Sequence, residues 1–197
     1  MRFLEAGDPA GPLLVLVHGG GVGPWMWARQ LSGLADGFHV VAPVLPGHDP
    51  EEASVFTTHG DASGRLAELI GPRRNGLPVT VAGFSLGGQT ALQLAADHPH
   101  LVDRLVVVSS LAAPYPLAPL MRPLMVAAAP LVRCRAFARA QARQLSIPPE
   151  LFGDYDRTAR SISPVSLSNI AAANFRFRVP AVLPASPRPT LLLAGAR

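Results

Sequence analysis

Lysine is absent from this 197-residue sequence, and all 17 of its basic residues are arginine. The arginines do not gather into one dense run, so we interpret the bias as a coding preference of the source rather than a functional signal. Cysteine is nearly absent as well, because Cys134 is the only one. A single cysteine excludes an internal disulfide and fits a reducing compartment, so the sequence predicts a cytoplasmic protein.

The sequence also lacks a long apolar run of the kind that enters membranes. Met1-Arg2-Phe3-Leu4 meets Glu5 at once, so no apolar leader is expected here. The uncharged stretch from Leu105 to Met121 contains three prolines and opens with a strand pattern, whereas a spanning helix needs about 20 apolar residues. We therefore expect no targeting segment and no membrane span.

Charged residues are scarce at 15%, while hydrophobic residues make up 49%, which excludes a disordered chain and predicts one substantial core. The net charge of +4 is unevenly distributed. Residues 1–110 carry six arginines against ten acids, whereas residues 111–188 carry ten arginines against three acids. A solvated helix face is the simplest explanation of this basic segment, and an anionic substrate or membrane surface is the alternative. Nucleic-acid binding is not expected, because no recognised motif accompanies the charge.

The most informative motif is Gly83-Phe84-Ser85-Leu86-Gly87. An apolar strand pattern, Val79–Ala82, precedes it, and a helical pattern, Gly88–Ala96, follows it. A G-x-S-x-G sequence between a strand and a helix is typical of a nucleophile elbow. The two glycines make room for a tight turn that lifts Ser85 out at the carboxyl edge of the strand. Ser85 is therefore the candidate nucleophile, and an ordinary glycine-rich turn is the alternative interpretation.

A second motif, His18-Gly19-Gly20-Gly21, follows the apolar run Leu13–Val17. A serine hydrolase needs amide N–H donors fixed where negative charge develops on the attacked carbonyl oxygen. The two motifs, in this order, make the chain resemble the α/β-hydrolase superfamily. The resemblance implies an oxyanion hole formed by the amides of Gly20 and Leu86, with structural roles for Gly19, Gly21, Gly83 and Gly87.

The resemblance extends to Val44-Leu45-Pro46-Gly47-His48, which is similar to the family's turn after the next strand. Val44 and Asp49 depart from the usual pattern of that turn. The resemblance implies that His18 and His48 have structural rather than catalytic roles. No cofactor and no metal ion are expected, because the sequence shows no metal-ligand cluster and no G-x-G-x-x-G dinucleotide pattern.

Alternating strand and helix patterns over residues 1–110 predict an α/β fold, with a mostly parallel sheet and helices on both faces. Strands are expected at Arg2–Ala6, Leu13–Val17, Phe38–Val44, Val79–Phe84 and Leu105–Ser109, and helices at Trp25–Leu34, at residues 59–71 and after Ser85 up to Asp97. The proline-rich residues 111–188 sit where the family inserts its helical lid, with helices about Leu131–Leu145 and Pro164–Phe175. Pro189–Gly195 returns to a strand pattern. We therefore expect a core at 1–110, a lid at 111–188 and a returning core strand at 189–197.

The family orders its catalytic triad as Ser, then Asp or Glu, then His. After Ser85 the only histidines are His98 and His100, at the end of the elbow's own helix and roughly 20 Å away. No carboxylate follows the strand that precedes the lid. We therefore expect the base and its acid beyond Arg197, in an α/β hydrolase shortened by its last strand and helix.

The sequence thus predicts a serine hydrolase acting on a small carboxylic ester, lactone or related acyl compound, with that small molecule as its partner. Trp25 is a candidate pocket residue, although packing of the oxyanion loop against the sheet is the commoner role for such a side chain. The alternative is a catalytically inactive fragment or a non-catalytic binding module on the same fold. The substrate and the oligomeric state stay open.

Overall fold

The computed structural model describes residues 1–51, 54–128, 130–131 and 134–195. Its strands form one sheet in the order β1-β3-β2-β4-β5-β6, in which β1 is antiparallel to β3 and the other pairs are parallel. The strands are β1 (Phe3–Ala6), β2 (Leu13–Val17), β3 (His39–Pro43), β4 (Thr80–Phe84), β5 (Arg104–Val108) and β6 (Thr190–Leu193). The mostly parallel sheet predicted from the sequence is therefore confirmed.

Helices cover both faces of this sheet. On one face, Val15 and Val17 of β2 belong to a core shared with α2 (His59–Ile70) and α3 (Leu86–Asp97). On the other face, Leu14 and Leu16 pack with Leu31 of α1 (Ala28–Leu34). All five residues of β2 are buried, as expected for a strand covered on both sides.

The helix predicted at Trp25–Leu34 is divided in the structure, which corrects that prediction. A 3-10 turn, η1 (Pro24–Trp27), precedes α1. Its last residue, Trp27, is the N-cap of α1 and has φ −93° and ψ 10°. The tighter turn sends the two tryptophans to different neighbours. Trp27 packs against the face of the sheet that α1 covers, whereas Trp25 packs against helices from residues 111–188.

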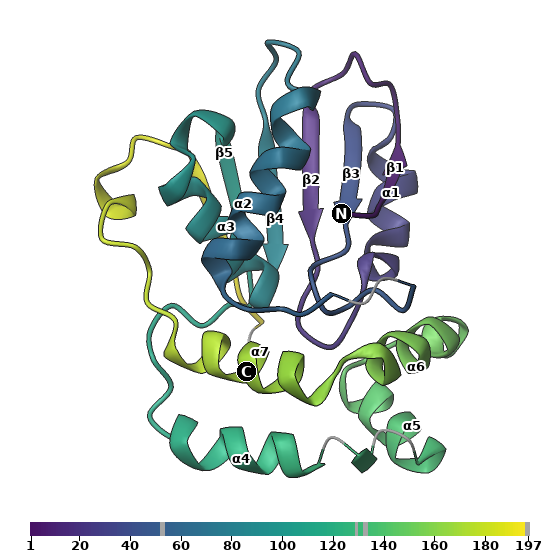
Figure 1. The fold of residues 1–197 in the computed structure, drawn as a ribbon. Helices are drawn as coiled ribbons and strands as arrows, with labels where there is room; N and C mark the ends of the chain where they lie inside the picture. The colour runs from purple at the N-terminus through teal and green to yellow at the C-terminus, as the bar shows by residue number, and fades with distance from the viewer. Residues whose placement is uncertain (52–53, 129, 132–133, 196–197) are drawn as a thin grey trace.

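Residues 111–188, called the helical segment below, contain more helix than the sequence predicted. Its helices are α4 (Ala118–Ala128), α5 (Arg135–Gln144), α6 (Phe152–Ser161) and α7 (Pro164–Arg176). The pattern indicated α5 and α7 but missed α4, which has Pro123 in its interior, and the polar α6. In Figure 1, α7 runs across the lower edge of the sheet, and α4 packs on the far side of α7. Short 3-10 turns complete the fold: η2 (Gly71–Arg73), η3 (Pro99–Leu101), η5 (Pro149–Leu151) and η6 (Leu183–Ala185).

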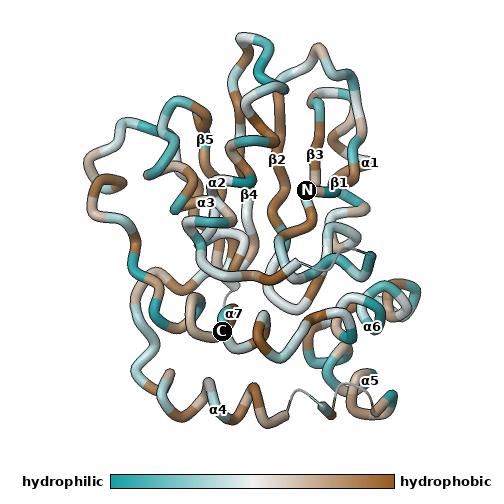
Figure 2. The backbone as a smooth tube through the Cα atoms, in the orientation of Figure 1, coloured by the Kyte–Doolittle hydropathy of each residue, from teal (hydrophilic) through white to brown (hydrophobic). Residues whose placement is uncertain are grey.

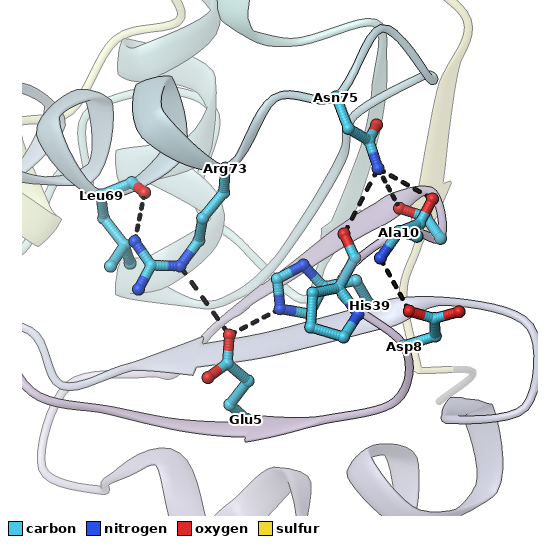
Figure 3. A network of polar contacts seen from close by, with 9 residues as sticks. Glu5, Asp8, Ala10, His39, Leu69, Arg73 and Asn75 are labelled. Atoms are coloured by element: carbon cyan, nitrogen blue, oxygen red, sulfur yellow. Dashed lines mark hydrogen bonds and ion pairs between the residues drawn. The ribbon is translucent and has the colours of Figure 1, made fainter.

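Polar contacts join the loops at the opposite edge of the sheet, where β2 and β4 begin (Figure 3). Glu5 of β1 lies 2.6 Å from His39 Nε2 and 3.9 Å from Arg73 Nε. Asn75 donates from Nδ2 to the carbonyl oxygens of Ala10 and Gly11, both at 2.9 Å. These contacts join the loops at the amino edge of the sheet to one another.

Candidate active site

Ser85 lies at the carboxyl edge of the sheet, between the end of β4 at Phe84 and the start of α3 at Leu86. Its backbone has φ 52° and ψ −116°, which is uncommon for a residue with a side chain. A Cβ on Gly83 would lie 2.3 Å from the carbonyl oxygen of Gly87. The turn therefore has the tight geometry expected of the motif, and the backbone strain falls on Ser85, which is half-buried.

The end of β5 holds this turn in place. The Ser85 N–H donates to the carbonyl oxygen of Val108 at 2.8 Å, and Ser110 Oγ donates to the Ser85 carbonyl oxygen at 2.8 Å. A Cβ on Gly88 would lie only 2.1 Å from Ser110 Oγ. Gly88 and Ser110 are thus structural parts of the elbow that the sequence analysis missed, because the G-x-S-x-G pattern includes neither.

The glycine-rich loop after β2 approaches the first turn of α3. A Cβ on Gly20 would lie 3.7 Å from Leu86 Cβ, and a Cβ on Gly87 would lie 2.3 Å from the carbonyl oxygen of Val17. Among the described residues, the amides of Gly20 and Leu86 have no backbone or side-chain acceptor. The Gly21 N–H, by contrast, donates to His48 Nε2 at 3.2 Å. The fold thus brings Gly20 close to Leu86, and neither amide has a protein acceptor among the described residues.

Two buried histidines tie this loop to the turn after β3. His18 donates from Nδ1 to the Gly19 carbonyl oxygen at 2.8 Å and accepts at Nε2 from the Leu45 N–H at 3.0 Å. His48 donates from Nδ1 to the Pro46 carbonyl oxygen at 3.0 Å and accepts at Nε2 from Gly21. Both rings are therefore neutral, and both nitrogens of each ring are occupied.

Burial has a direct effect on the protonation of this pair. Desolvation, together with the charge that His48 would carry, lowers the pKa of His18 to about 3. Desolvation lowers the pKa of His48 to about 4. Neither ring can take a proton from a serine hydroxyl without breaking a contact that holds the loop, so the geometry assigns them to the scaffold.

The other histidines form no hydrogen bond with Ser85 Oγ within the described residues. His59 is buried, donates from Nδ1 to Thr90 Oγ1 at 3.0 Å, and has its pKa lowered to about 4 by desolvation. His98 and His100 lie at the far end of α3, as the sequence indicated. Within the part of the chain that the structure describes, no imidazole or carboxylate forms a hydrogen bond with Ser85 Oγ.

Trp25 does not pack on the sheet, contrary to the commoner role expected for it. Its Nε1 donates to Thr158 Oγ1 of α6 at 3.1 Å, and its ring packs in a cluster with Val22 and Tyr155. The loop after β2 is consequently joined to the helical segment. Whether Trp25 touches a substrate stays a prediction.

Helix α7 lies next to the candidate site, across the carboxyl edge of the sheet (Figure 1). Ile170 Cγ2 lies 3.1 Å from the position of a Cβ on Gly20, and Ile170 is buried in the main core. Asn169 Nδ2 donates to the Phe56 carbonyl oxygen at 3.0 Å. Gln89 of α3 donates from Nε2 to the carbonyl oxygens of Leu111 and Asn174, both at 3.1 Å. These contacts fix α7 over the glycine-rich loop.

The described residues contain no group of three or more His, Cys, Asp or Glu side chains placed to hold a metal ion. No helix formed by them is both long enough and apolar enough to cross a bilayer.

Known structures share this fold. A hydrolase from Pseudomonas aeruginosa PA01 superposes with a TM-score of 0.79 at 24% identity, over 98% of this chain and 75% of that one. The enol-lactonase from Burkholderia xenovorans LB400 superposes with a TM-score of 0.78 at 21% identity, over 100% of this chain and 78% of that one. At such identities the likeness establishes the fold, which is that of the α/β hydrolases.

The sequence comparisons define the family. The model of the alpha/beta hydrolase family matches residues 14–197, so the chain belongs to this family, as the sequence motifs predicted. Among curated proteins, the pimeloyl-[acyl-carrier protein] methyl ester esterase of Aromatoleum aromaticum is 40% identical over 99 residues. That match covers 50% of this chain and 37% of the esterase, so it spans well under half of the relative's length.

Proposed function

We propose that this chain carries the nucleophile and the oxyanion hole of a serine hydrolase that acts on a small carboxylic ester, lactone or related acyl compound. Ser85 Oγ attacks the carbonyl carbon, and the amides of Gly20 and Leu86 stabilise the negative charge that develops on the carbonyl oxygen. The observation that carries the proposal is the backbone of Ser85, held at φ 52° and ψ −116° beside two amides without protein acceptors. Esterase-like and lactonase-like relatives support the same class of reaction.

A serine hydroxyl needs a base to become a useful nucleophile, and the proposal assigns that base to a group outside residues 1–197. Both nitrogens of His18 and His48 are engaged in holding the loop, and His59 is bonded to Thr90. We also assign residues 111–188 to a lid. The position of Ile170 against Gly20 supports this role, because a helix there limits which acyl groups reach Ser85.

The test is reaction with a fluorophosphonate probe and with short-chain p-nitrophenyl esters, using the natural gene product that includes this chain. Ser85→Ala and Ser85→Gly should both lose labelling and turnover. The matched control is Ser146→Gly, because Ser146 is also a serine with positive φ, at 55°, but lies in the helical segment. Unchanged labelling of the Ser85 variants would overturn the assignment of the nucleophile.

The second candidate function is a non-catalytic binding module on the same fold. The absence of a base bonded to Ser85 Oγ, within the described residues, is the observation that favours it. A gene product that binds an acyl ligand in the site but shows no probe labelling and no turnover would select this alternative.

A further inference from the structure

Helix α4 exposes an apolar face where a surface helix ordinarily exposes polar side chains. Leu117 immediately precedes α4, and Leu120 and Leu124 lie four residues apart within it, on one side of the helix. Their residues are 53%, 63% and 59% exposed. Figure 2 shows hydrophobic stretches along α4. Met125 and Leu131 are also exposed, at 38% and 49%.

Among the described residues, α7 is the only element with which α4 makes extensive contacts, and α7 separates α4 from the sheet (Figure 1). Soluble proteins rarely leave contiguous apolar patches uncovered, and such patches mark sites of interaction with proteins or membranes. The exposed apolar face of α4 is therefore a candidate interaction surface.

The charge beside the patch is of one sign. Residues 111–149 contain five arginines and no acidic residue. Three of these, Arg135, Arg139 and Arg143, recur every four residues along α5, and all three are exposed. Ala138 and Ala142 are the buried residues of α5, and the arginines lie next to this buried side, where the Arg139 guanidinium carbon is 5.7 Å from the centre of the Phe152 ring. No carboxylate within the described residues forms an ion pair with any of the three.

Figure 1 shows α4 and α5 at the same end of the molecule, away from the sheet. Exposed leucines and exposed arginines at one end match the chemistry of an interfacial membrane segment. The apolar side chains enter the boundary between headgroups and acyl chains, and the arginines bind anionic headgroups. A second copy of the chain would bring two basic segments together, which like-charge repulsion opposes.

We propose that the outer face of α4 and α5, defined by Leu117, Leu120, Leu124, Met125 and the three α5 arginines, docks on an anionic lipid surface. Docking would place the helical segment, and hence the approach to Ser85, at the membrane boundary. The proposal goes beyond the hydrolase function and does not depend on it, because binding can be measured without turnover.

The first experiment is co-sedimentation of the chain with vesicles of phosphatidylcholine, alone or with roughly one-third phosphatidylglycerol. We expect binding to the anionic vesicles that weakens as salt is added. The double variant Leu120→Ser/Leu124→Ser should bind the anionic vesicles roughly tenfold more weakly, because it removes the inserted side chains. Replacing Arg135, Arg139 and Arg143 with Gln should remove the preference for phosphatidylglycerol.

The matched control is Leu34→Ser/Leu77→Ser. It removes two leucines that are 37% and 41% exposed, at the end of α1 and before β4, and should leave vesicle binding unchanged. Circular dichroism establishes that each variant folds. Failure of the unaltered chain to bind anionic vesicles would overturn the proposal, as would an equal loss in the control variant. If the unaltered chain is a dimer and the α4 variant is a monomer, this face is an interface between two copies of the chain, and the proposal is overturned.

The single cysteine gives a second readout without mutagenesis. Cys134 is exposed at the N-cap of α5, between the leucines of α4 and the arginines of α5. The amides of Phe137 and Ala136 lower the pKa of its thiol, which favours labelling near neutral pH. A polarity-sensitive fluorophore on Cys134 should shift to the blue with anionic vesicles. An unchanged spectrum under conditions of full binding would show that another face docks.

Discussion

At the residue scale, the elbow depends on a third glycine in addition to the two of its motif. Gly83 is required by the backbone of its own turn, Gly87 by the carbonyl oxygen of Val17 at the end of β2, and Gly88 by Ser110, which follows β5. The G-x-S-x-G pattern includes the first two glycines. It does not include Gly88, whose closest contact comes from a different strand.

Gly88→Ala should therefore lower the free energy of unfolding by about 1–3 kcal/mol, the usual cost of forcing a methyl group into a filled space. The matched control is Gly64→Ala in α2, where a Cβ would meet nothing within 4 Å. That change should raise stability by up to about 1 kcal/mol, because alanine is the better helix former. Urea denaturation of both variants measures the difference. Equal effects at the two positions would show that the contact with Ser110 does not constrain Gly88.

At the scale of elements, Gln89 of α3 links the start of the helical segment to the last turn of α7. Its side-chain amide spans the carbonyl oxygens of Leu111, which follows β5, and Asn174, near the end of α7. The sequence placed Gln89 on the elbow's helix but gave no reason to expect these partners. Such a bridge needs two backbone segments that only the folded chain brings together.

Gln89→Met should remove both hydrogen bonds and leave two partly buried carbonyl oxygens unpaired, at a cost of about 1–3 kcal/mol. We expect thermolysin to cleave the helical segment of this variant faster than that of the unaltered chain. Gln93→Met is the control in the same helix, because Gln93 bonds only to the neighbouring Asp97. Cleavage at the same rate in both variants would mean that Gln89 does not anchor α7.

At the scale of the whole molecule, three buried histidines make stability depend on pH. Burial lowers the pKa of His18 to about 3 and those of His48 and His59 to about 4, from 6.5. The unfolded chain therefore binds more protons than the folded one below pH 6.5. The contribution of these neutral histidines to the free energy of unfolding is fully present above pH 6.5 and is lost as the pH falls toward 4.

Each of these histidines contributes roughly 1.4 kcal/mol per pH unit within that window, or about 4 kcal/mol per unit for all three. Urea denaturation at intervals between pH 8 and pH 5 should show a plateau and then a steep fall. His59→Gln, which keeps a donor for Thr90, should reduce the slope by about one third. A flat profile below pH 6.5 would contradict the assignment of neutral, buried rings.

Taken alone, the sequence determined the features that depend on neighbouring residues. Apolar runs such as Leu13–Val17 locate the strands, because a strand buried on both faces needs apolar side chains throughout. Glycines on either side of Ser85 locate the elbow, because only they fit so tight a turn. The α/β-hydrolase fold and family follow from these local patterns and their order.

Only the tertiary structure decided the features in which distant segments meet. It paired His18 and His48 with backbone groups across the loop, and so fixed both rings as neutral scaffold. It also turned Trp25 toward α6 and set Ile170 against Gly20. On α4 it decided which leucines stay uncovered, because that choice depends on where α7 packs. Local periodicity carries none of this information, since it describes an element and not the surface that the element will meet.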